Sequence, residues 1–190
     1  MAEYCIGTAQ FGMDYGIANQ SGKPKQDEID RIVEFAVESN IRYFDTAQSY
    51  GESETILGKA VSKLPDVHNI RMISKLAPDL QESSSAIIIE SVKSSLEKLN
   101  VGSLYGFLGH RVEAINSDSF ITAIEILKKD RLVIKTGVSV YTPEDALDAM
   151  KNPLVEILQI PFNILDGRWI DEGIIEKAQE NNIQLFFRSI

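Results

Sequence analysis

Four side chains that could together form a carbonyl-reducing site lie at or just after the ends of three consecutive apolar segments of the chain. They are Asp45, Tyr50, Lys75 and His110. A phenol is a weak acid with an ordinary pKa of about 10, and a nearby ammonium lowers that pKa and eases proton donation to a carbonyl oxygen. A carboxylate beside the lysine keeps it charged and in place, and a neutral histidine can donate a hydrogen bond to the negative charge that develops on the carbonyl.

Each of these residues also has an ordinary structural interpretation when it is taken alone. Asp45 would be a turn or cap residue and Tyr50 a half-buried aromatic side chain. Lys75 would be a surface charge at the end of a strand, and His110 a hydrogen-bonded histidine nearby. Their joint occurrence at the ends of three neighbouring strands favours the chemical interpretation.

Seven short segments rich in Ile, Val, Phe and Tyr are predicted to be strands. They do not alternate cleanly between apolar and polar residues, which is typical of parallel strands that are covered on both faces. The predicted strands are residues 4–8, 42–47, 70–76, 104–110, 134–140, 156–162 and 183–188.

Helical patterns separate these strands. Stripes of apolar residues predict helices around 29–36, 54–61 and 88–99, and further helices are expected at 119–129, 143–150 and 172–181. Ser53 and Thr142 are predicted N-caps, and Asn40 is a predicted helix stop.

Regular alternation of strand and helix predicts right-handed βαβ units and a parallel sheet. The turn after the first strand, IGTAQFGMDYG, lacks the glycine pattern of a doubly wound dinucleotide fold. We therefore expect an α/β protein of the (β/α)8 TIM-barrel class, with functional groups at the carboxyl ends of the strands. About seven β/α units are visible, so we expect one domain over residues 1–190 that lacks the last strand and helix.

Composition excludes several other classes of protein. The formal net charge of −9 provides no basic surface for nucleic acid. No segment approaches the roughly 18 apolar residues of a membrane span, and no signal peptide is visible. We expect a cytoplasmic protein that binds neither nucleic acid nor membrane. Cys5, the single cysteine, is expected to be a buried structural thiol. The two histidines, of which His68 is expected to be solvated, show no spacing that predicts a metal site.

The sequence resembles the aldo-keto reductase family from Ile6 onward. The motif FDTAQSYGESETILGKAV resembles the family signature after the second strand. Lys75 in ISKL and His110 in FLGHR match the family's lysine and histidine, and IGTAQFG, IKTGVSVY and LQIPFNILD continue the resemblance.

The resemblance implies reduction of an aldehyde or ketone with a nicotinamide cofactor, either NADP(H) or, as the alternative, NAD(H). It implies that Tyr50 donates the proton, that Lys75 and Asp45 activate it, and that His110 orients a small-molecule carbonyl substrate. The positions matched to cofactor contacts are Gly7, Thr8, Asp45, Ser139, Gln159, Arg188 and Ser189.

Two positions depart from the family pattern. Val140 stands where many members have Asn. Arg188 stands where an aromatic residue commonly stacks on the nicotinamide, so its guanidinium would either stack instead or reach the cofactor pyrophosphate. The family's eighth strand and adenosine-phosphate segment would lie beyond Ile190, and we expect these 190 residues alone to bind the cofactor weakly.

Two other functions stay open. A regulatory or otherwise non-catalytic protein on the same scaffold would have a truncated cofactor site, and a barrel isomerase or aldolase would use Lys75 for a Schiff base. An unclosed barrel would also expose strand edges through which copies of the chain could associate.

Overall fold

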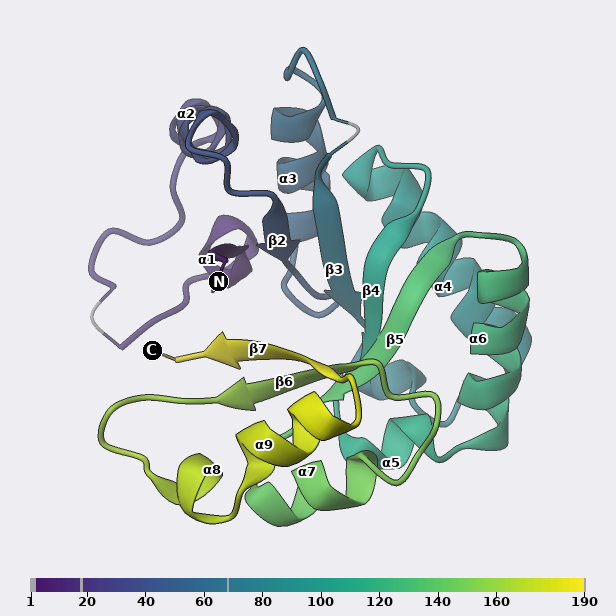
Figure 1. Ribbon diagram of the computed structural model, residues 1–190. Helices are drawn as coiled ribbons and strands as arrows, with labels where there is room; N and C mark the ends of the chain where they lie inside the picture. Colours follow the sequence, from purple (N-terminus) through teal and green to yellow (C-terminus); the bar gives the residue numbers. More distant parts are fainter. Residues whose placement is uncertain (1–2, 18, 68, 190) are drawn as a thin grey trace.

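The computed structural model describes residues 3–17, 19–67 and 69–189 (Figure 1). Within these residues, seven parallel strands form one sheet in chain order, and each strand pairs with the next. They are β1 (Cys5–Gly7), β2 (Tyr43–Asp45), β3 (Arg71–Lys75), β4 (Leu104–Gly109), β5 (Val133–Ser139), β6 (Ile157–Pro161) and β7 (Gln184–Arg188). All seven predicted strands are confirmed, each within one or two residues of its predicted ends.

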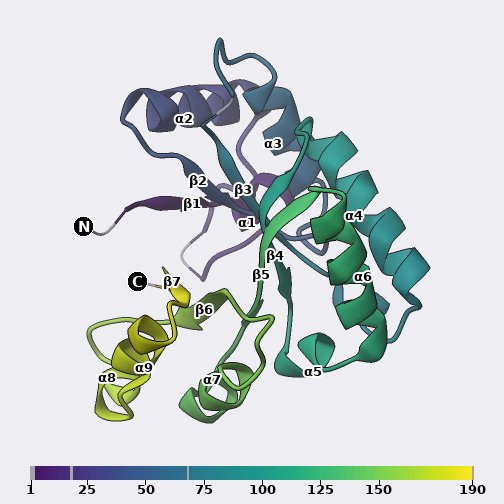
Figure 2. The same cartoon turned by 45° about the vertical axis from the view of Figure 1, so that its right-hand side comes forward.

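Helices cover the outer face of this curled sheet (Figures 1 and 2). The longer ones are α2 (Gln26–Glu38), α3 (Ser53–Val61), α4 (Ser85–Leu99), α6 (Asp118–Lys129), α7 (Pro143–Ala149) and α9 (Ile174–Glu180). One-turn helices are α1 (Ala9–Gly12), α5 (Val112–Ile115) and α8 (Arg168–Asp171), and a 3-10 turn spans Pro78–Leu80. The arrangement confirms the predicted α/β barrel class.

Both faces of the central strands β2 to β6 are mostly buried, which explains why their sequences do not alternate. Strands β1 and β7 are more exposed. One cluster of side chains fills the inside of the curve and includes Tyr43, Ile73, Leu108, Ile157 and Phe186. A larger cluster lies between the sheet and the helices. It includes residues of the same strands that neighbour those of the first cluster, together with the fully buried Trp169.

The curve is open between its first and last strands. Among the described residues β1 pairs with β2 alone and β7 with β6 alone. Figure 2 shows these two strands on the same side of the molecule, with the two chain ends beside them. The described residues therefore build seven strands of a barrel whose wall is open on one side.

Local predictions at helix ends have mixed outcomes. Thr142 is an N-cap as predicted, since its Oγ1 accepts from the Asp145 amide at 3.2 Å, and Asn40 has the positive φ of a helix stop. The cap prediction for Ser53 is wrong, because Ser53 is the first helical residue and its hydroxyl donates instead to the carbonyl of Thr8 at 2.8 Å. The predicted helix 172–181 begins later, at Ile174. His68 lies outside the described residues.

Candidate active site

A buried ion pair joins the ends of β2 and β3. The ammonium of Lys75 is 2.7 and 2.8 Å from the two carboxylate oxygens of Asp45 and donates to the carbonyl of Thr46 at 2.8 Å. Burial disfavours the charged form of Lys75, but Asp45 and then Tyr50 outweigh this effect, so the pKa of Lys75 is raised above its ordinary value. The lysine is therefore a permanent cation inside the rim of the barrel.

Tyr50 lies directly beside this cation. The Lys75 ammonium is 5.0 Å from the centroid of the Tyr50 ring, and the tyrosine is half-buried. The turn that carries it is held by hydrogen bonds between backbone groups, from Tyr50 to Ala47 and from Ser53 to Tyr50. The structure thus brings Asp45, Lys75 and Tyr50 together, as the sequence predicts.

His110 follows β4 and stays neutral. Burial is the first cause that lowers its pKa, and the positive charges of Lys75, Arg111 and Arg188 lower it further, against a smaller opposing effect of Asp45. Its Nδ1 is buried and has no hydrogen-bond partner in the protein. A neutral imidazole can donate a hydrogen bond to a ligand without transferring a proton to it.

Two hollows open at this rim. The first, which we call the β1–β7 hollow, has a volume of about 430 Å3 and lies at the open side of the barrel. Its lining includes six of the seven predicted cofactor positions and two predicted catalytic residues, with Asp45 counted in both groups. The residues are Cys5, Gly7, Thr8, Ala9, Gln10, Tyr15, Asp45, Tyr50, Gln159, Phe186, Phe187, Arg188 and Ser189.

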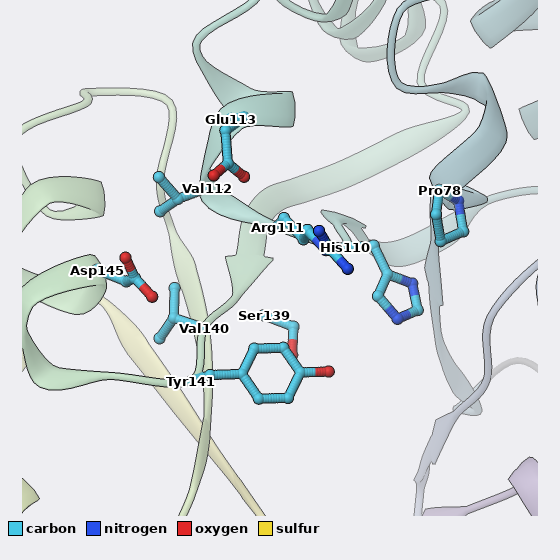
Figure 3. A pocket seen from close by; sticks show the side chains of 9 residues that line it. All are labelled: Pro78, His110, Arg111, Val112, Glu113, Ser139, Val140, Tyr141 and Asp145. Carbon is cyan, nitrogen blue, oxygen red and sulfur yellow. The ribbon is translucent and has the colours of Figure 1, made fainter.

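The second, which we call the β4–β5 hollow, has a volume of about 400 Å3. Figure 3 shows Pro78 and His110 on one side of it, Asp145 and Val112 on the other, and the ring of Tyr141 between them. Its remaining lining residues are Arg111, Glu113, Ser139 and Val140. The predicted residue Ser139 therefore faces the hollow of His110, although it is the direct strand partner of Gln159.

Gln159 links the ion pair to the β1–β7 hollow. Its Nε2 donates to Asp45 at 3.0 Å, while its Oε1 is buried with no partner in the protein. An amide group of a ligand could satisfy this free acceptor, so Gln159 fits the carboxamide of a nicotinamide ring.

Two other predicted cofactor positions differ in what they can offer. An added Cβ on Gly7 would meet nothing within 4 Å, so Gly7 leaves its backbone open to a ligand. The hydroxyl of Thr8 is already engaged, because it donates to the carbonyl of Asp45 at 2.9 Å and lies 2.8 Å from the hydroxyl of Ser53. The backbone N–H of Thr8 also donates to the carbonyl of Asp45 at 2.9 Å, and its carbonyl accepts from the Phe11 amide at 2.9 Å. Thr8 therefore lines the hollow with its hydrogen-bonding groups already engaged.

Arg188 takes part in a contact that the sequence did not predict. Its guanidinium lies over the ring of Tyr141, 4.3 Å from the centroid, and Nη2 donates to the carbonyl of Val140 at 3.3 Å. Tyr141 was missed as a site residue, although its place two residues after Ser139 in IKTGVSVY, beyond a strand end, was a usable signal. Ser189 follows with a positive φ of 61°.

Cys5 was predicted as a buried structural thiol, and it lines the β1–β7 hollow as a half-buried one. Burial, followed by the charge of Asp45, raises its pKa to about 12. The thiol stays protonated at neutral pH and is a poor nucleophile.

In the described part of the chain, no group of three or more His, Cys, Asp and Glu side chains could hold a metal ion. Nor does any helix described there have the length and apolar character that crossing a membrane requires.

A parallel α/β barrel with a buried Lys–Asp pair, a tyrosine and a neutral histidine at its carboxyl rim defines the class of this protein. The chain belongs to the aldo/keto reductase family, whose family model matches residues 3–190. The resemblance stated from the motifs is confirmed.

Individual relatives agree with this family. Aldo-keto reductase str7 of Strobilurus tenacellus is 24% identical over 187 residues, which cover 95% of this chain and 54% of that protein. A Pseudomonas aeruginosa structure described as an aldo-keto reductase has a TM-score of 0.80 at 24% identity and covers 96% of this chain and 71% of that one. The aldo-keto reductase of Klebsiella pneumoniae, solved with NADPH, has a TM-score of 0.74 at 19% identity, over 97% of this chain and 62% of that one. The chain spans about half the length of the curated relatives it matches.

Proposed function

We propose that this chain carries the reducing site of an NAD(P)H-dependent carbonyl reductase, in which Tyr50 donates a proton to the carbonyl oxygen of an aldehyde or ketone. One observation carries the proposal. The buried ammonium of Lys75, held by Asp45, lies 5.0 Å from the centroid of the Tyr50 ring at the edge of a hollow that can hold a ligand.

The cation beside Tyr50 explains why this tyrosine would be the proton donor. Proton donation leaves a phenolate, and a fixed positive charge nearby stabilises that anion. Asp45 and the carbonyl of Thr46 hold the ammonium in place, so no reorganisation is needed when the charge develops.

His110 would orient the substrate from the other hollow. Its lowered pKa keeps it neutral at physiological pH, so it can donate a hydrogen bond to the carbonyl oxygen without protonating it. The β4–β5 hollow, which His110 and Ser139 line, offers space for the rest of a small substrate.

The cofactor would occupy the β1–β7 hollow, where Gly7, Thr8, Asp45, Gln159, Arg188 and Ser189 meet. When bound, it supplies the hydride that reduces the carbonyl carbon. The free acceptor of Gln159 fits a carboxamide, and Ser139 is its neighbour on β5. The NADPH bound to the Klebsiella protein supports NADP(H) as the cofactor, with NAD(H) as the alternative.

The substitution Tyr50→Phe tests the proposal. It removes one hydroxyl and leaves the packing of the ring unchanged. We expect NADPH-dependent reduction of a panel of aldehydes and ketones, followed by nicotinamide absorbance, to fall at least about 100-fold. Tyr15→Phe is the matched control, because Tyr15 lines the same hollow and lies outside the ion pair. Undiminished turnover by Tyr50→Phe would rule out this role.

A non-catalytic aldo/keto reductase-like protein is the second candidate, because in the described residues the hollow proposed for the cofactor lies at the open side of the barrel. No quenching of nicotinamide fluorescence on mixing with NADPH, together with no reduction of any carbonyl in the panel, would favour this candidate.

A further inference from the structure

Three positive charges and one negative charge act on His110 at the reaction centre. Lys75, Arg111 and Arg188 all lower the pKa of His110, after the effect of burial, and Asp45 alone opposes them. Asp45 is already shared between Lys75 and Gln159. Among the described residues, neither Arg111 nor Arg188 lies within ion-pair distance of a carboxylate. Glu113 and Asp145 line the β4–β5 hollow, whereas the charged residues that line the β1–β7 hollow are Asp45 and Arg188. Arg188 therefore brings a positive charge without a carboxylate partner to the hollow beside Tyr50.

The charge of Arg188 is fixed in position. Its guanidinium lies 4.3 Å from the centroid of the Tyr141 ring, and its Nη2 donates to the carbonyl of Val140. Its Nε is buried without a partner. Arg188 lines the β1–β7 hollow while Tyr141 lines the β4–β5 hollow, so the stacked pair joins the walls of the two hollows. A side chain held on both sides in this way cannot swing its charge out to water without losing these contacts.

The proposed reaction requires the nicotinamide ring to reach the carbonyl carbon next to Tyr50. The ring must then enter the hollow that Arg188 shares with Tyr50, Asp45 and Gln159. This ring bears a positive charge when oxidised and none when reduced, whereas the phosphates of the cofactor are the same in both forms. A fixed cation in the hollow therefore acts on the two forms differently, and the effect is strengthened where water is excluded.

We propose that Arg188 makes the site discriminate between the two oxidation states of the cofactor. Its positive charge favours binding of the neutral reduced ring and weakens binding of the cationic oxidised ring. The inference rests on the proposed function and adds a specific consequence: NADP+ leaves the site readily after turnover, so the site is biased toward carbonyl reduction.

The alternative role for Arg188 predicts a different result. If its guanidinium binds a cofactor phosphate, it stabilises both forms equally, because both carry the same phosphates. The ratio of the two dissociation constants, Kd for NADP+ divided by Kd for NADPH, therefore separates the two roles.

The experiment compares Arg188→Gln with Arg188→Lys. Gln removes the charge and keeps a planar amide, whereas Lys keeps the charge and loses the plane. NADPH and NADP+ are titrated into each protein by calorimetry, without substrate. We expect the Kd ratio to fall about tenfold in Arg188→Gln, a change of about 1.4 kcal/mol, and to stay near the wild-type value in Arg188→Lys.

The control is Arg168→Gln, which removes the same charge from an exposed arginine that pairs with Asp166. It should leave the ratio unchanged. A ratio unaltered by Arg188→Gln, with both forms weakened alike, would overturn the inference and leave the proposed function intact. Failure of the wild-type protein to bind either form would instead remove the proposed function, and the inference with it.

Discussion

At the scale of single residues, burial of the charge of Lys75 is energetically unfavourable. The residue is 1% exposed, and a buried charge is tolerated only when it is paired and hydrogen-bonded. Replacement of a buried ion pair by well-packed apolar residues is often neutral or stabilising. The Lys75–Asp45 pair is therefore weak evidence for a stabilising role, and its position at the rim agrees with a chemical one.

The lowered pKa of His110 predicts how stability depends on pH. The unfolded chain binds a proton on this histidine below its ordinary pKa of about 6.5, whereas the folded chain binds it only at lower pH. The contribution of His110 to stability is therefore complete above that value and is lost as pH falls through the folded pKa. We expect the free energy of unfolding in urea to decrease between pH 7 and pH 5, and to decrease less in His110→Gln. The lowered pKa values of Asp30 and Asp166 act at still lower pH, below 3.8. An equal decrease in both proteins would contradict the prediction.

At the scale of elements, close packing of α1 against the turn before α3 positions Tyr50. A Cβ built on Gly12 would lie 1.8 Å from the carbonyl oxygen of Tyr50 and 2.4 Å from the amide of Ser53. A Cβ built on Gly51, which has a φ of +56°, would lie 2.5 Å from the carbonyl oxygen of Gly12. Glycine is required at both positions because backbone meets backbone there.

Gly12→Ala is expected to displace the turn that carries Tyr50. Overpacking of this kind costs about 1–3 kcal/mol, and a shift of roughly 1 Å in a catalytic group can cost about 100-fold in rate. We expect a lower urea midpoint and a reduced kcat. Gly102→Ala is the control, since its added Cβ would meet nothing within 4 Å. Equal activity and stability in both variants would show that the turn does not depend on this contact.

At the scale of the whole molecule, the open side of the barrel divides the strands into two kinds. Strand β4 pairs with β3 and β5, whereas in the described chain β1 and β7 each pair on one side only. Strands with an unpaired edge open locally at lower free energy and can pair with another chain. The β1–β7 hollow thus lies between the two strands with the fewest pairing partners.

Hydrogen exchange read by mass spectrometry should follow this order. We expect the amides of β4 to exchange slowest and those of β1 and β7 to exchange much faster. We also propose that copies of the chain associate through the open edges of β1 and β7. Protection of the amides of these two strands should then rise with protein concentration. Protection of β1 and β7 equal to that of β4 at high dilution would contradict the expected order.

Strands were easier to predict than short helices, for a physical reason. The central strands β2 to β6 are mostly buried on both faces, so a run of apolar residues marks each of them without reference to its neighbours. Helices α1, α5 and α8 have four residues each, which is too short for an apolar stripe to appear. Ser53 looked like a local cap, but its hydroxyl bonds to Thr8, which is 45 residues away. Such a partner cannot be read from neighbouring sequence.

The sequence by itself determined which side chains meet at the rim. The carboxyl ends of parallel strands lie on the same side of a sheet, so Asp45, Lys75 and His110 converge whatever the details of packing. Only the tertiary structure decided how their surroundings are used. The hydroxyl of Thr8 is engaged by Ser53, and Arg188 lies on Tyr141, because the curvature of the sheet brings together residues far apart in the chain. The sequence shows that Arg188 carries the charge that we propose to select the oxidation state of the cofactor. The position of this charge beside the site depends on the curvature of the sheet.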